Sequence, residues 1–176
     1  HGWSRDTDLH NSFKNNYKNL DDRFLFIGPG YNVRPTDIQA AIALNQFKRL
    51  NKFIKIRNEN RNKIINFLKI NNNWNNQFNF VKVDINIKPS WFGLPILIDK
   101  RYAHIKKEFL NHLTKKGIEN RPIISGNFLN QPASKFFNFS SSTKDFKNAD
   151  EIENRGFFIG LHTNKIKNIE IKYIVN

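Results

Sequence analysis

The chain has 176 residues, with 29 Lys and Arg against 15 Asp and Glu, which gives a formal net charge of +14 at pH 7. It contains no cysteine, which excludes disulfides and thiolate metal sites, and no apolar run of about 18 residues that would predict a transmembrane helix. The positive charge would suit nucleic acid or an anionic surface. Abundant Asn, Lys and Ile, as an AT-rich coding sequence produces, explain the charge more simply.

Residues 1–34 are predicted to form a loop-rich segment. Polar and aromatic residues are mixed through 1–23, and a short apolar run at 24–27 predicts a strand that ends in a Gly-Pro-Gly turn. Trp3 and Arg5 stand out in the first loop. They indicate either a surface loop packed by one indole or a loop that helps to close a binding site.

Residues 35–70 are predicted to form one long helix. Pro35 suits the first helical position, and Thr36 and Asp37 place side-chain oxygens and a negative charge at the positive end of the helix. Apolar residues then recur at three- and four-residue spacing as far as Leu68, which is typical of an amphipathic helix. The asparagine-rich stretch at 58–62 is the expected place for a break.

The turn before this helix carries polar groups that suit an anion. Asn32 offers an amide, Arg34 offers a guanidinium, and the helix start offers backbone N–H groups, so a phosphate or carboxylate is the predicted ligand. Tyr31 stands beside them. The alternative is structural, with Arg34 in solvent and Asn32 chosen for a left-handed backbone.

Residues 77–176 are predicted to form a small α/β domain after an asparagine-rich loop at 71–76. Gly117 is the expected stop of one helix, and a loop is expected at 125–145. The predicted strands are 78–87, 91–98, 118–124 and 156–161, and the predicted helices are 101–116, 148–153 and 164–175. This alternation predicts a small mixed or antiparallel sheet with helices on one side, whose first two strands are antiparallel.

Three residues of this domain are candidates for ligand binding. Arg121 lies at a predicted strand end, where its guanidinium suits a carboxylate or phosphate, although an arginine in solvent fits as well. Trp91 could stack on a sugar or nucleotide but is more typical of a core indole. His162 follows a strand and could face the same cleft, although a lone histidine is more often a satisfied polar group. No metal-ligand spacing, nucleophile elbow or phosphate-binding glycine loop is present in the sequence.

Several separated motifs resemble those of one enzyme family. They are His-Gly-Trp-Ser-Arg-Asp at 1–6, Gly-Tyr-Asn-x-Arg-x-Thr-Asp-x-Gln-Ala-Ala-Ile at 30–42, Pro-Ser-Trp-Phe-Gly-Leu-Pro at 89–95, and Gly-Ile-Glu-Asn-Arg-Pro-Ile-Ile-Ser-Gly-Asn-Phe-Leu-Asn-Gln-Pro at 117–132. In this order they resemble the DegT family of pyridoxal-phosphate (PLP) dependent enzymes, which act on nucleotide-linked keto-sugars as aminotransferases or 3-dehydratases. The resemblance runs through nearly the whole chain.

The resemblance implies that the chain is a C-terminal portion of a cytoplasmic fold-type I PLP enzyme, and the absence of methionine agrees with a fragment. It implies the end of the large domain at 1–34, an inter-domain helix at 35–70 and the small domain at 77–176. The full-length homodimer would bind PLP and a nucleotide 4-keto-6-deoxyhexose in surface-polysaccharide biosynthesis. The cofactor lysine, or the histidine that replaces it, would lie in the missing part. The isolated chain is therefore expected to be inactive and to self-associate through exposed apolar surface.

The resemblance also implies roles for individual residues. Asn32 and Arg34 would reach the cofactor phosphate or the substrate of the neighbouring subunit. The residues expected near the substrate are Tyr31, Trp3, Arg5, Arg121, Asn127, Trp91 and His162. With a cofactor lysine the enzyme would transfer an amino group from glutamate to C4 of the sugar, and with histidine it would remove the C3 hydroxyl. The motifs look slightly more like the dehydratase branch.

A hypothesis of another class is a non-catalytic basic α/β module that binds nucleic acid or another polyanion. Its binding surface would be the run of basic residues between Lys48 and Lys69, which only Glu59 opposes. Aromatic residues are poorly interleaved there, which disfavours stacking on bases and makes nucleic acid the weaker prediction.

Overall fold

The computed structural model describes residues 2–5, 7–18, 20–22, 25–31, 33, 35–139 and 145–176. The chain divides into two units, His1–Lys48 and Arg49–Asn176, which are described separately. This division lies between two helices and differs from the predicted limits at 34 and 70–77. The domain limits of the complete enzyme stay a prediction.

A short backbone pairing holds the first unit. Trp3 and Phe26 form an isolated antiparallel bridge, and the Ser4 N–H donates to the Leu25 carbonyl at 3.0 Å. Helix α1 (His10–Asn16) follows the first of these segments. The predicted strand at 24–27 is therefore only a bridge at Phe26, and residue 24 lies outside the described residues.

Helix α2 (Asp37–Phe47) begins two residues after the predicted start at Pro35, with a capping box at Thr36. The Thr36 hydroxyl oxygen accepts from the Gln39 N–H at 3.4 Å, and the Gln39 side chain accepts from the Thr36 N–H at 2.9 Å. Pro35 consequently precedes the N-cap and does not occupy the first helical position, which corrects the prediction. Every residue of α2 is exposed.

Helix α3 (Leu50–Ile70) is a separate helix, so the prediction of one helix over 35–70 is wrong. The interruption falls at Lys48 and Arg49, and α3 continues through the asparagine-rich stretch at 58–62 where a break was expected. Asparagines there bond both within the helix, as the Asn58 amide does to the Ile54 carbonyl one turn earlier at 2.9 Å, and to groups outside it. The Asn58 amide, for example, donates to the Pro89 carbonyl at 2.9 Å.

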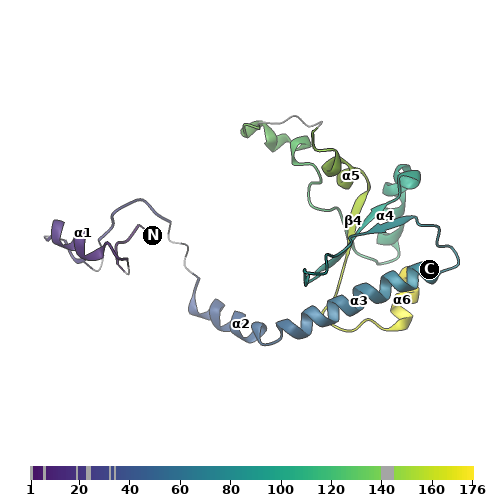
Figure 1. Cartoon of the computed structure of the whole chain (residues 1–176), viewed down its shortest axis with the longest axis horizontal. Helices are drawn as coiled ribbons and strands as arrows, with labels where there is room; N and C mark the ends of the chain where they lie inside the picture. Colours follow the sequence, from purple (N-terminus) through teal and green to yellow (C-terminus); the bar gives the residue numbers. More distant parts are fainter. Residues whose placement is uncertain are drawn as a thin grey trace. The chain divides into compact units, whose positions relative to one another are not determined.

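The second unit contains a four-stranded antiparallel sheet, as Figure 1 shows beside α3 and α4. The strands are β1 (Phe78–Phe80), β2 (Gly93–Ile98), β3 (Asn120–Arg121) and β4 (Gly156–Gly160), in the order β1-β2-β4-β3. The predicted antiparallel pairing of the first two strands is confirmed. The predicted strands 78–87 and 118–124 are too long. Strand β1 ends at Phe80, and β3 ends at Arg121, before Pro122 and the positive φ of 48° at Ile124.

One face of this sheet carries the core. Ile96 pairs with Phe80 and with Phe157, and since paired residues share a face, these side chains point the same way. Leu94, Ile96 and Ile98 of β2 pack with Phe157 and Ile159 of β4, Ile64 and Ile65 of α3, and Leu113. The α/β class with helices on one side of a small sheet is thus confirmed.

The remaining elements frame the sheet. They are η2 (Lys100–Ile105), α4 (Lys106–Lys115), η3 (Phe128–Asn130), η4 (Pro132–Phe136), α5 (Lys147–Arg155) and α6 (Asn168–Val175). Gly117 ends the α4 segment with a φ of +73°, as predicted. Arg155 is 8 % exposed and donates to the Ile98 carbonyl and to Glu151, which fixes α5 against β2. Within the described residues, no helix is long and apolar enough to cross a membrane.

Candidate functional site

The candidate residues of the first unit fall into two groups. Trp3 is half-buried, its ring meets that of Phe26 edge-on at 5.5 Å, and the Arg5 guanidinium lies 4.3 Å from the Trp3 ring centroid. Tyr31 is 85 % exposed and available to a ligand. Asn32 and Arg34 lie outside the described residues.

Arg121 lies on the face of the sheet opposite the core. It pairs with Phe158, which pairs with Pro95, and these residues alternate with the core residues of their strands. Its Nε and one terminal nitrogen donate to Glu119 Oε1 at 3.0 and 2.7 Å. The side chain of Arg121 is 68 % exposed. This exposed ion pair can exchange its carboxylate for a ligand phosphate at little cost.

Asn127 is 2 % exposed and fastens its loop to α5. Its amide donates to Asp150 Oδ1 at 2.7 Å, its backbone N–H donates to Glu153 Oε2 at 3.1 Å, and its side-chain oxygen accepts from the Leu129 N–H at 3.1 Å. The polar atoms of Asn127 are therefore used within the chain. A direct role in substrate binding stays a prediction, and the contacts present hold the Gly-Asn loop in place.

The same loop is fitted tightly against α5. Gly126 has a φ of +62°, and a Cβ at this position would lie 2.3 Å from the Cβ of Glu153. Only glycine fits there. Lys106 Nζ donates to the Glu153 backbone carbonyl at 2.7 Å, and burial lowers the pKa of Lys106 below its ordinary value. The loop, α5 and the start of α4 are thus tied together.

Trp91 packs partly buried against the core, which agrees with the structural interpretation of this indole. The Arg61 guanidinium lies 4.7 Å from the Trp91 ring centroid and donates to the Val81 carbonyl at 2.7 Å. Burial lowers the pKa of Arg61 below its ordinary value. One face of the ring is therefore already occupied by a cation.

His162 is exposed at the end of β4, and its ring stabilises a turn. Its Nδ1 accepts from the Asn164 N–H at 2.9 Å, which leaves Nε2 to carry the proton of the neutral ring. The backbone carbonyl of His162 accepts from the Asn60 amide of α3 at 3.1 Å. Nε2 is the ring atom that remains for a ligand.

The candidates of the second unit do not share one cavity. His162, Phe92 and Glu119, the ion-pair partner of Arg121, line one open groove of about 670 Å³. Trp91 lines a different pocket with Arg61, and the loop that carries Asn127 borders a third. The acidic pair Asp150 and Glu153, which holds the Asn127 loop, was not predicted, although its i, i+3 spacing on a predicted helix was a signal for it.

Comparison with known proteins identifies the class. Residues 3–176 match the DegT/DnrJ/EryC1/StrS aminotransferase family. The chain is 32 % identical over 165 residues to a GDP-4-keto-6-deoxy-D-mannose 3-dehydratase of Escherichia coli O55:H7, covering 92 % of this chain and 41 % of the relative. A 3-dehydratase of the same name from Yersinia pseudotuberculosis is 32 % identical over 180 residues, covering 96 % of this chain and 43 % of that protein.

Solved structures agree in fold. A histidine-to-asparagine variant of a GDP-4-keto-6-deoxymannose 3-dehydratase with bound GDP-perosamine has a TM-score of 0.80 at 31 % identity, covering 99 % of this chain and 44 % of that one. The E. coli 3-dehydratase with bound hydrated PLP has a TM-score of 0.79 at 29 % identity, with the same coverage of 99 % and 44 %. The chain therefore belongs to the DegT/DnrJ/EryC1/StrS aminotransferase family, and it spans less than half the length of these relatives.

Proposed function

We propose that this chain is the C-terminal part of a PLP-dependent enzyme that removes the C3 hydroxyl of a GDP-linked 4-keto-6-deoxyhexose. The observation that carries the proposal is the 32 % identity over 92 % of the chain to a 3-dehydratase. The second candidate is 4-aminotransfer on the same class of sugar, which the family's name supports. No described contact favours the polyanion-binding module over these two. A cytoplasmic location and a role in surface polysaccharide synthesis follow from the same proposal.

The donor set around α2 fits the phosphate of PLP. Asn32 and Arg34 would supply an amide and a guanidinium directly before a capped helix N-terminus, where the helix dipole favours an anion. PLP, when bound, supplies an electron sink for the chemistry at the sugar. Arg121 would bind a phosphate of the nucleotide after leaving Glu119, and the exposed Tyr31 would contact the sugar.

The product distinguishes the two reactions. We expect the full-length enzyme, given PLP, glutamate and GDP-4-keto-6-deoxymannose in D₂O, to replace the C3 hydroxyl by deuterium and to release ammonia as glutamate is oxidised. Aminotransfer would instead keep the C3 hydroxyl and place nitrogen at C4, without free ammonia. Mass spectrometry and NMR of the sugar separate these outcomes, and turnover to neither product contradicts the proposal.

The homodimer is part of the same proposal and is supported by the surface of α2. Four large apolar side chains of this helix are mostly exposed, namely Ile38, Ile42, Leu44 and Phe47 at 74, 60, 65 and 70 %. A helix with apolar residues on several sides is typically buried in the complete assembly. The partner subunit is the proposed cover of α2.

The isolated chain is consequently expected to self-associate through α2. Ile42→Glu is expected to shift the chain toward monomer in size-exclusion chromatography with light scattering, because a charge cannot be buried in an apolar contact without large cost. Asn51→Glu, an equal charge added at an exposed position of α3 outside the proposed contact, is the control and should leave association unchanged. A native chain that is monomeric at every concentration tested contradicts the prediction.

A further inference from the structure

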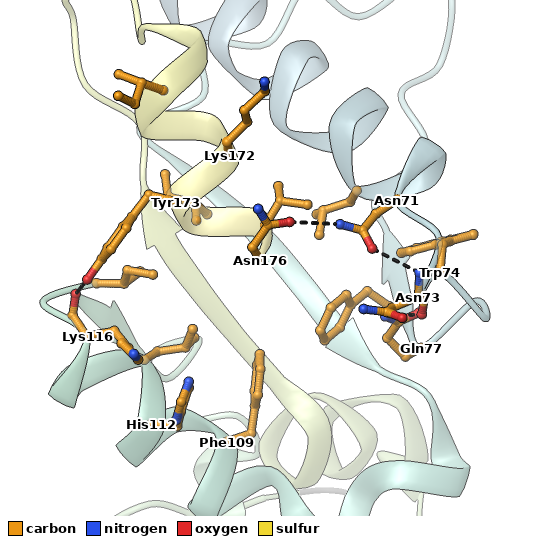
Figure 2. A pocket seen from close by; sticks show the side chains of 17 residues that line it. Asn71, Asn73, Trp74, Gln77, Phe109, His112, Lys116, Lys172, Tyr173 and Asn176 are labelled. Carbon is orange, nitrogen blue, oxygen red and sulfur yellow. Dashed lines mark hydrogen bonds between the residues drawn. The ribbon is translucent and has the colours of Figure 1, made fainter.

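A pocket of about 580 Å³ lies between α4, α6 and the C-terminal end of α3 (Figure 2). All of its lining residues belong to the second unit, and none is among the candidate site residues of the proposed enzyme. Its volume is in the range of pockets that enclose small organic ligands. The pocket adjoins the groove that His162 and Glu119 line, because Ile118, Ile169, Tyr173 and Ile174 line both.

Two hydrogen bonds hold the walls of this pocket together. The Tyr173 hydroxyl of α6 donates to the Lys116 carbonyl at the end of α4 at 2.8 Å, and the Asn71 amide after α3 donates to the Asn176 side-chain oxygen at 3.1 Å (Figure 2). These bonds join α6 to each of its neighbours across the opening. The pocket is thus a built feature of the unit and not a gap between unconnected helices.

The inner wall is apolar. Phe78 and Phe109 have ring centroids 5.6 Å apart, and Leu113 beside them is only 9 % exposed. These residues are the outer surface of the core, so an apolar group placed against them leaves water without breaking any hydrogen bond. Trp74 adds an indole to the same pocket.

The polar residues of the lining are cationic or neutral. His112 and Lys116 stand one helical turn apart on the α4 segment, and Figure 2 shows both side chains leaving that segment toward the pocket. None of the described residues that line the pocket has a carboxylate side chain, and the negative group among them is the α-carboxylate of Asn176, the last residue of the 176-residue chain. The last carbonyls of the α4 segment accept hydrogen bonds within the chain, as the Leu113 carbonyl does from the Ile118 N–H at 2.9 Å.

We propose that this pocket binds a small amphiphilic carboxylate. The apolar body of the ligand, aromatic or branched aliphatic, lies against Phe78, Phe109 and Leu113. The carboxylate accepts from Lys116 Nζ and the His112 ring. The apolar part of the ligand thus meets the apolar wall, and its carboxylate meets the basic residues.

The test is a titration of the full 176-residue chain with 2-naphthoate, with 2-naphthamide as the neutral isostere. We expect saturable one-to-one binding with a dissociation constant below about 1 mM, roughly tenfold weaker binding of the amide, and weakening by salt. In ¹H–¹⁵N spectra the Trp74 indole signal is expected to move, while that of Trp91, which lies outside the pocket, stays in place. Trp74→Phe assigns the signal.

Matched variants locate the carboxylate. Lys116→Gln should weaken the binding of 2-naphthoate about threefold, because it removes one partly solvated ion pair. It should leave the binding of 2-naphthamide unchanged. Lys115→Gln removes the same charge from an exposed neighbour that does not line the pocket, and it should change neither affinity. Ile169→Trp enlarges a lining residue that is 75 % exposed, so it should block the pocket without disturbing the core.

Three results would overturn the proposal. They are the absence of saturable binding up to about 5 mM, equal effects of Lys116→Gln and Lys115→Gln, and a shift of the Trp91 signal with none at Trp74. Thermal unfolding of each variant shows that its fold is intact before the affinities are compared. None of these measurements depends on the activity of the complete enzyme. Their outcome therefore tests this inference independently of the proposed function.

Discussion

Replacing Asn60 by alanine is expected to lower the free energy of unfolding of the 176-residue chain by about 3 kcal/mol. Asn60 is 3 % exposed in the middle of α3. Its amide donates to the carbonyls of His162 and Asn164 at 3.1 and 2.8 Å, and its oxygen accepts from the Ile166 N–H at 3.0 Å. Alanine removes the side chain with which all three of these backbone groups bond.

The magnitude follows from where these partner groups lie. Ile166 packs partly buried against the core. Most of the free-energy cost of removing Asn60 therefore comes from leaving the Ile166 N–H unpaired away from water. His162 and Asn164 are exposed, and their carbonyls can turn to water. The expected loss is therefore smaller than three fully buried groups would give.

Urea denaturation followed by circular dichroism measures this loss. Asn66→Ala is the matched control, because Asn66 lies on the same helix but is exposed, and its replacement should change stability by less than about 0.5 kcal/mol. Equal stability of the two variants would show that the Asn60 contacts do not hold the 162–166 segment to α3.

Replacing Arg121 by alanine in the full-length enzyme is expected to lower kcat/KM for the nucleotide-sugar by about 10- to 100-fold, as the loss of one charge-assisted hydrogen bond to a phosphate predicts. The prediction rests on the proposed function. Because a nucleotide phosphate is bound equally in the ground and transition states, the loss should appear mainly in KM. Steady-state kinetics with separate values of kcat and KM provide the measurement.

Arg101→Ala is the control for this experiment. Arg101 is also exposed and also donates to the carboxylate two residues before it, with its Nε 2.7 Å from Asp99 Oδ1. Its ion pair resembles that of Arg121 and Glu119, but it lies at the start of η2 and has no proposed ligand. Equal kinetic effects of the two replacements would remove Arg121 from the substrate site.

Local signals in the sequence predicted much of the fold. Thr36, predicted at a helix start, caps α2, Gly117 ends the α4 segment, and the apolar run at 91–98 contains the buried strand β2. These features depend on neighbours within a few residues, and short-range backbone physics governs them. The family could also be recognised from the sequence, because several motifs that occur in the family's order are far more specific than a single motif.

The candidate site was less predictable, because its residues have partners far along the chain. Asn127 was expected at the substrate, and its buried contacts with Asp150 and Glu153 on α5 could not be read from its own motif. Trp91 could not be assigned to solvent or core until Arg61 of α3 was found over its ring. The identity of a polar or aromatic residue does not show which distant group it bonds to or packs against in the folded chain.

The sequence by itself determined the family, the α/β class and the helix and strand types, since these follow from periodicity, capping and ordered motifs. Only the tertiary structure decided that α3 runs unbroken through its asparagines, that β3 is a two-residue strand, and that a pocket opens between α4 and α6. The reasons differ, because β3 ends early, before Pro122 and Ile124, whereas α3 is held by contacts far along the chain. Hydrogen bonds across 102 to 106 residues, such as those of Asn60, override local preference and become visible only when the chain is folded.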